Sequence, residues 1–178
     1  MSLPTCPRLL RTVLRTVASH FAAHQRRAKW PFLWRVTLEG IGVSLTAVLV
    51  IGGIFDLGDR KDLDQWPVAE LVFWGCLVAP VIETFLCQML PVMIARTLRL
   101  GFWMQIAVSV VFFAAAHAPS GAITVIGAGL TGGFYLAFTY VRWREESLWS
   151  AVYMTVGAHL VHNALLVPIL LLGRIFAP

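Results

Sequence analysis

The chain has 178 residues, of which 58% are hydrophobic and 13% are charged; an ordinary soluble domain has roughly 45–50% and 25%. A water-soluble domain of this size keeps much of its surface exposed, so it could not bury this many apolar side chains. The same composition excludes an intrinsically disordered chain. We therefore expect one integral membrane protein that crosses the bilayer several times.

The formal net charge of +5 does not indicate a nucleic-acid-binding protein, because half of the 14 Lys and Arg residues lie within the first 35 positions. A basic cluster ahead of an apolar core is typical of membrane orientation and of contact with lipid headgroups. The cysteines, Cys6, Cys76 and Cys87, form no CxxC pair. Neither a disulfide framework nor a thiolate metal site is expected.

Residues 1–34 are predicted to form a basic N-terminal segment, followed by a transmembrane core at 35–178. Within this segment, apolar residues recur at helical spacing: Leu9, Leu10, Val13, Leu14, Val17 and Phe21. Arginines occupy another face, which is the pattern of an amphipathic helix lying in the membrane interface. A cleaved signal peptide fits poorly, because its apolar region is usually only about 7–15 residues long.

Five apolar segments follow, at about Val36–Phe55, Val68–Leu98, Phe102–His117, Ala122–Trp143 and Leu148–Leu172. Pro80 and Pro91 predict kinks or a break in the second segment. Glycines at 127, 129, 132 and 133 predict close helix contact in the fourth. The fold class is therefore all-α, a transmembrane bundle of about five spans preceded by an interfacial helix.

The orientation can be predicted from the basic residues. With five spans, eleven Lys and Arg fall on the side of the N-terminus, and three fall on the other side, namely Arg60, Lys61 and Arg174. This distribution places the N-terminus in the cytoplasm. We expect an integral protein of a bacterial inner membrane.

Four polar residues inside the apolar segments are the main functional signal. Glu83 lies in the second segment, His117 ends the third, and His159 and Asn163 lie one helical turn apart in the fifth. A charged carboxylate at the bilayer centre costs about 2.5–3.5 kcal/mol on insertion scales, so such a residue needs a partner or a function. Together the four supply a base, a water-orienting group and oxyanion donors, which is hydrolytic chemistry. His162 is expected to pack beside them.

Three ordered motifs carry a family resemblance: Glu83-Thr84-x-x-x-Gln88, Phe113-x-x-x-His117 and His159-x-x-x-Asn163. They resemble the EExxxR, FxxxH and HxxxN motifs of the CPBP family, which comprises CAAX-type prenyl endopeptidases and bacteriocin-processing relatives. These are glutamate-dependent intramembrane proteases with each motif on a different transmembrane helix. The resemblance covers about residues 71–171.

The first motif departs from the family pattern. Thr84 stands where a second Glu is expected, and Gln88 stands where an Arg is expected. The two changes remove one negative and one positive charge, and hydrogen bonding by a neutral pair can replace a buried ion pair at little net cost. Glu83 is left as the candidate catalytic carboxylate.

The resemblance implies that Glu83 and His117 hold and deprotonate a water molecule that attacks the scissile carbonyl. His159 and Asn163 would donate hydrogen bonds to the resulting oxyanion. The implied substrate is a membrane-anchored or lipid-associated polypeptide, reached from the non-cytoplasmic side if the charge distribution sets the orientation. No cofactor, metal or nucleic acid is expected.

Two alternatives stay open. The cluster could be structural in a catalytically inactive member, or in a binding or immunity-type membrane scaffold. It could also bind zinc in a metal-dependent intramembrane protease, because histidine and carboxylate are zinc ligands. The sequence contains no HExxH motif and divides its histidines among helices, which favours metal-free hydrolysis.

Overall fold

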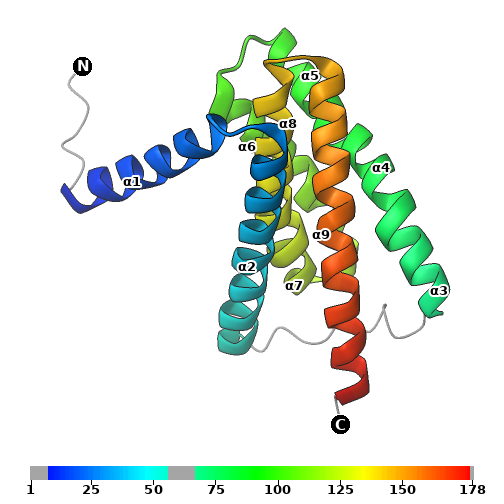
Figure 1. The fold of residues 1–178 in the computed structure, drawn as a ribbon. Coiled ribbons are helices and arrows are strands. Elements are labelled where there is room, and N and C mark those ends of the chain that lie inside the picture. Colours follow the sequence, from blue (N-terminus) through cyan, green and yellow to red (C-terminus); the bar gives the residue numbers. More distant parts are fainter. Residues whose placement is uncertain (1–7, 56–66, 177–178) are drawn as a thin grey trace.

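The computed structural model describes residues 8–55 and 67–176. Over these residues the chain forms six long helical segments and no strand, and five of the six are long and apolar enough to cross a membrane. The predicted all-α bundle is thereby confirmed. Figure 1 shows the five long segments packed side by side, with the sixth, at the N-terminal end, projecting sideways from one end of the bundle.

The projecting helix is α1 (Arg8–Gln25), and the first span is α2 (Lys29–Phe55). The span therefore begins earlier than the expected Val36, and the expected boundary between residues 34 and 35 falls inside α2. Hydropathy marks where the apolar run begins, whereas helical hydrogen bonding also includes the preceding basic turn. Pro31 is tolerated there because the first turn of a helix does not need its N–H.

The second span alternates between α-helical and wider π-helical winding. Its parts are α3 (Val68–Glu70), a π-helical stretch at Leu71–Val78, α4 (Ala79–Glu83), a second π-helical stretch at Thr84–Met89, and α5 (Leu90–Thr97). Pro80 and Pro91 are each the second residue after a π-helical stretch. A proline has no N–H and clashes with the preceding turn, and an inserted π turn relieves both problems without a break.

The other spans are α6 (Phe102–His117) with a short 3-10 turn at Ala118–Ser120, then α7 (Ala122–Thr124), a π-helical stretch at Val125–Gly132 and α8 (Gly133–Arg144), and finally α9 (Leu148–Phe176). The connections at 26–28, 98–101 and 145–147 lie at one end of the bundle, and the connection at 118–121 lies at the other (Figure 1). Arg60 and Lys61, used to predict the orientation, are outside the described residues, and so is the side chain of Arg174.

The apolar core is centred on α8, which is the most deeply buried helix of the bundle. Phe138 and Tyr140 are fully buried there, and Phe32 of α2 stacks on Phe138 with ring centroids 5.9 Å apart. Phe21 of α1 joins the same cluster, 5.0 Å from the Phe138 ring. This aromatic cluster fixes the half of the bundle near α1 and holds the end of α1 against it.

Two glycines press the fourth span against α6, as the glycine pattern predicted. A Cβ atom at Gly129 would lie 2.9 Å from the Ala114 Cα, and one at Gly133 would lie 2.9 Å from the Phe113 ring. Real Cβ atoms do not approach other atoms so closely, so only glycine allows this contact. The contact sits beside Phe113 and His117, and it therefore helps to position the second motif.

Candidate active site

The four predicted site residues line one cavity of ≈ 320 Å³. Glu83 comes from α4, His117 from the end of α6, and His159 and Asn163 from α9. Each span contributes the residue that the sequence pattern singled out, so the structure brings all four together. His162 also lines this cavity, with its ring 3.9 Å from the position of a Cβ at Gly132.

Glu83 lies on the face of the second span that lines the cavity, and every fourth residue on this face contributes to the wall. Leu71, Gly75, Ala79 and Glu83 all line the wall. The Glu83 Oε2 atom lies 3.6 Å from His159 Nε2. This separation is longer than a hydrogen bond, so the two groups are close neighbours on the cavity wall and are not directly bonded.

The hydrogen bond of His117 fixes its tautomer. Its Nδ1 atom lies 2.9 Å from the backbone carbonyl oxygen of Phe113. A carbonyl oxygen only accepts, so Nδ1 carries the proton and the neutral ring has its lone pair on Nε2. The Phe113 ring contacts both imidazoles, with centroids 4.5 Å from His117 and 5.8 Å from His159. The first residue of the FxxxH motif thus positions two of the site rings.

Asn163 is tied to the second span by the local effect of a proline. In the π-helical stretch the Ala79 N–H bonds to the Trp74 carbonyl, five residues back. The same pattern would pair the next nitrogen, that of Pro80, with the carbonyl of Gly75, but proline has no hydrogen to donate. The Asn163 side-chain amide donates to this Gly75 carbonyl at 2.7 Å. An amide nitrogen carries a second hydrogen, which stays available for another acceptor.

The neutral residues of the first motif do not bond to each other. Gln88 is fully buried, and its side-chain oxygen accepts from the Ser109 hydroxyl of α6, whose single hydrogen is shared with the Cys87 carbonyl at 2.8 Å. Thr84 is fully buried too, and its hydroxyl oxygen has no partner. The hydrogen bond at the position of the expected ion pair links the second span to α6.

Sequence reasoning missed several groups. The carbonyl of Gly75 is one, and the presence of Pro80 five residues later was the signal for it. A second polar cluster, remote from the cavity, was also missed: His20 and His24 of α1 meet Glu39 of α2. The i, i+4 spacing of two histidines in a predicted helix could have indicated it.

Comparison with known proteins agrees with the motifs. Residues 65–165 match the family described as type II CAAX prenyl endopeptidase Rce1-like. A search of curated proteins and a search of solved structures each find no match. The matched region is more than half of the chain and contains all four site residues, and it confirms the resemblance to the CAAX protease group. The chain belongs to the Rce1-like type II CAAX prenyl endopeptidase family.

Proposed function

We propose that this protein is an intramembrane endopeptidase that hydrolyses a peptide bond of a membrane-anchored or lipid-associated polypeptide. The observation that carries the proposal is the single cavity in which a carboxylate, imidazoles and an amide from three spans meet. Membership of a peptidase family supports the same reaction class. The function of a structural scaffold would not require these groups to face an open cavity.

The reaction begins with a water molecule held between Glu83 and the His117 Nε2 lone pair. Glu83 takes a proton from the water molecule while the water oxygen attacks the scissile carbonyl carbon. The carbonyl oxygen becomes an oxyanion, which accepts hydrogen bonds from His159 Nε2–H and from the second hydrogen of the Asn163 amide. Protonated Glu83 then gives the proton to the leaving nitrogen, the C–N bond breaks, and the carboxylate is restored.

The geometry of the cavity favours this metal-free reaction over zinc-dependent hydrolysis. A zinc site needs three protein atoms directed at one point about 2 Å away. In the described part of the chain, the group with three ligating atoms close to one another is formed by His20, His24 and Glu39, outside the cavity. The cavity histidines are instead spread around a space large enough for water and a peptide.

We also propose that the N-terminus lies in the cytoplasm and that the cavity opens toward the opposite side. The bundle end formed by the connections at 26–28, 98–101 and 145–147 carries basic residues at Arg96, Arg99, Arg142 and Arg144. Ser120, in the connection at the other end, lines the cavity. Tags at each terminus, tested for cleavage by added protease in sealed spheroplasts, decide this: accessibility of the N-terminal tag alone would contradict the proposed orientation.

The peptidase proposal is tested by comparing the membrane peptides of cells that express the wild type, Glu83→Gln or Glu70→Gln. Glu70 is the matched control, because it lies in the same span but is exposed outside the cavity. We expect product peptides that are present with the wild type and Glu70→Gln and absent with Glu83→Gln, at equal protein levels. Unchanged products with Glu83→Gln would overturn the proposal and favour a scaffold.

A further inference from the structure

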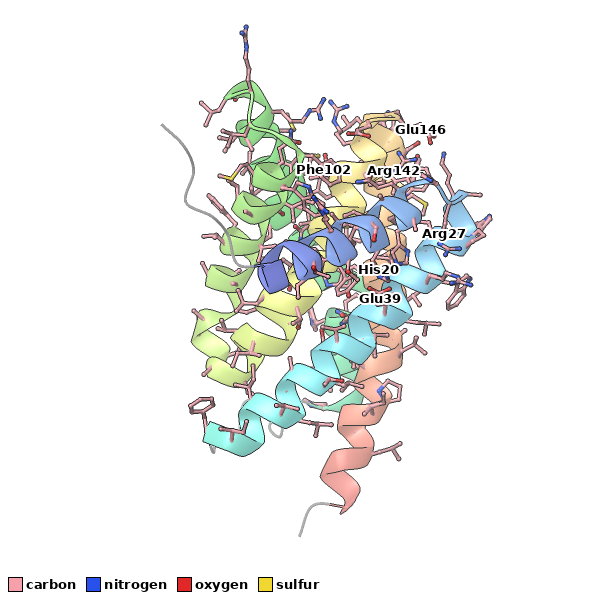
Figure 2. All side chains as sticks on the ribbon, turned by 90° about the vertical axis from the view of Figure 1, so that its left-hand side faces the viewer. His20, Arg27, Glu39, Phe102, Arg142 and Glu146 are labelled. Carbon is pink, nitrogen blue, oxygen red and sulfur yellow. The ribbon has the colours of Figure 1, made fainter. Side chains whose placement is uncertain are left out.

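A second polar cluster lies where α1 crosses α2, away from the cavity. His20 and His24 are one turn apart on α1, and both rings face Glu39 of α2; Figure 2 shows His20 directed at Glu39. The His20 Nε2 lies 2.8 Å from Glu39 Oε1, and the His24 Nε2 lies 2.9 Å from Glu39 Oε2. The two Nε2 atoms are 3.2 Å apart. Three potential ligand groups therefore point at one small space.

Hydrogen bonds can hold this cluster when both imidazoles donate through Nε2, one to each oxygen of the ionised Glu39 carboxylate. The two Nε2 atoms then lie 3.2 Å apart, and neither accepts from the other. When both imidazoles carry their hydrogen on Nδ1 instead, two Nε2 lone pairs lie beside a carboxylate. A cation is the group that all three can then bind at once.

The spacing also fits a metal ion. Four-coordinate zinc has Zn–N and Zn–O distances of about 2.0–2.2 Å, which place neighbouring ligand atoms about 3.3 Å apart. The separation of 3.2 Å between the two Nε2 atoms is close to this value. The Nε2–oxygen distances of 2.8 and 2.9 Å are hydrogen-bond distances, and they would widen by about 0.4–0.5 Å around an ion. Two histidines and one carboxylate are also the ligand types that zinc and related divalent transition metals prefer.

The surroundings orient the ligands and leave access for an ion. The Tyr135 hydroxyl of α8 donates to Glu39 Oε1 at 2.8 Å. Hydrogen bonds of this kind hold a metal-binding carboxylate in its orientation. His24 is buried, whereas about half of the His20 side chain is exposed. The cluster borders a cavity of ≈ 390 Å³ that Arg27 and Arg35 also line. Their positive charge suits a hydroxide or another anion as the fourth ligand.

We propose that His20, His24 and Glu39 form a binding site for a divalent transition metal of the zinc type, separate from the peptidase cavity. The bound ion joins α1 to α2. The other contacts of α1 with the bundle include Phe21 in the aromatic cluster and a 2.8 Å hydrogen bond from Arg142 to the Gln25 carbonyl. These contacts all lie in the last turns of α1, so the metal controls how firmly the amphipathic helix is attached to the bundle.

The site is tested by titrating Zn²⁺ and Co²⁺ into the full chain, purified in detergent and stripped with a chelator. We expect one bound ion per chain and, for Co²⁺, an absorption spectrum typical of nitrogen and oxygen ligands. His20→Ala removes a ligand from an exposed position, and it should weaken binding more than Tyr135→Phe. Tyr135→Phe should lower the affinity for the metal by about 10–100-fold, the usual effect of removing a hydrogen bond to a metal-binding side chain.

His117→Ala is the matched control, because it removes a histidine from the cavity and should leave metal binding unchanged. Binding that survives in His20→Ala but is lost in His117→Ala would place the ion in the cavity and overturn the proposal. Absence of tight binding to the wild type would overturn it as well. Neither result depends on peptidase activity, so these experiments can contradict the metal site without contradicting the proposed function.

The attachment of α1 has its own readout. Arg15 is exposed on α1 and is a site for trypsin. Zinc should slow trypsin cleavage after Arg15 in the wild type and should have no effect in His20→Ala. Equal cleavage rates of the wild type with and without zinc would show that the ion does not fasten α1.

Discussion

The cavity and the α1–α2 cluster both combine a glutamate with histidines, but their atoms are spaced differently. In the cavity the groups come from three spans, and Glu83 stands 3.6 Å from His159. In the α1–α2 cluster the contacts between Glu39, His20 and His24 measure 2.8 to 3.2 Å. The cavity has a volume of ≈ 320 Å³, enough for a water molecule and part of a peptide, whereas the ligand atoms of the α1–α2 cluster lie close enough together for a single ion. We propose hydrolysis at the first and metal binding at the second.

Asn163→Ala should have the largest effect of the variants that probe the oxyanion side of the cavity. Loss of one oxyanion donor typically lowers kcat by about 10²–10³. The variant also leaves the Gly75 carbonyl without its donor, which should cost about 1–3 kcal/mol of unfolding free energy. Turnover in liposomes and thermal unfolding measure the two effects. A wild-type rate would remove Asn163 from the proposed mechanism.

Zinc should stabilise the protein through the α1–α2 cluster and not through the cavity. A ligand at 100 times its Kd raises the free energy of unfolding by about 2.7 kcal/mol. We expect a rise in Tm with zinc for the wild type and for Glu83→Gln, and a much smaller rise for His24→Ala. An equal rise in all three proteins would break the distinction between the two sites.

Gly129→Ala should perturb the cavity by pushing α6 away from the fourth span. Its Cβ would lie 2.9 Å from the Ala114 backbone, and such overpacking typically costs about 1–3 kcal/mol. Gly42→Ala is the control, because a Cβ there meets no atom within 4 Å. Thermal unfolding should show destabilisation only for Gly129→Ala. If both variants unfold like the wild type, the close contact beside His117 is not required.

The smallest effect is expected at an exposed ion pair near the start of α2. Lys29 donates to Glu146 at 2.6 Å, and this hydrogen bond holds the pKa of the Glu146 carboxyl below its ordinary value. A lowered pKa means that the pair stabilises the fold at neutral pH and loses that effect as the pH falls through the lowered pKa. Solvent screens both groups, so the effect should be slight. As the pH falls, the Tm of the wild type should decrease slightly more than the Tm of Glu146→Gln. Equal decreases in the two proteins would contradict this.

The sequence predicted the spans and the cavity residues because both depend on contrast within an apolar chain. Long hydrophobic runs mark the spans, and the few polar exceptions, Glu83, His117, His159 and Asn163, mark the site. Each of these polar residues is costly in lipid, so its presence in an apolar segment already indicates a functional or structural role. The early start of α2 was missed because helical hydrogen bonding continues through residues that hydropathy does not mark.

The contacts that tie the site together could not be predicted in the same way. The bond from Asn163 to Gly75 depends on π-helical winding before Pro80, and the bond from Gln88 to Ser109 depends on how α6 packs against the second span. Helical periodicity assumes regular winding, so it misplaces side chains after such a turn. The α1–α2 cluster depends on the angle at which α1 folds back on α2, which no local pattern in the sequence specifies.

The role of the cavity as the active site is tested by the kcat/KM of purified protein in liposomes, with a substrate peptide identified by comparing the membrane peptides of the expressing cells. The assay compares the wild type, Glu83→Gln and Glu70→Gln, and the metal content of each sample is measured alongside. We predict a loss of about 10²–10⁴ in kcat/KM for Glu83→Gln, as expected for loss of a general base, with wild-type values for Glu70→Gln and equal metal content in all three. A Glu83→Gln protein that cleaves at the wild-type rate would contradict the assignment of this cavity as the active site.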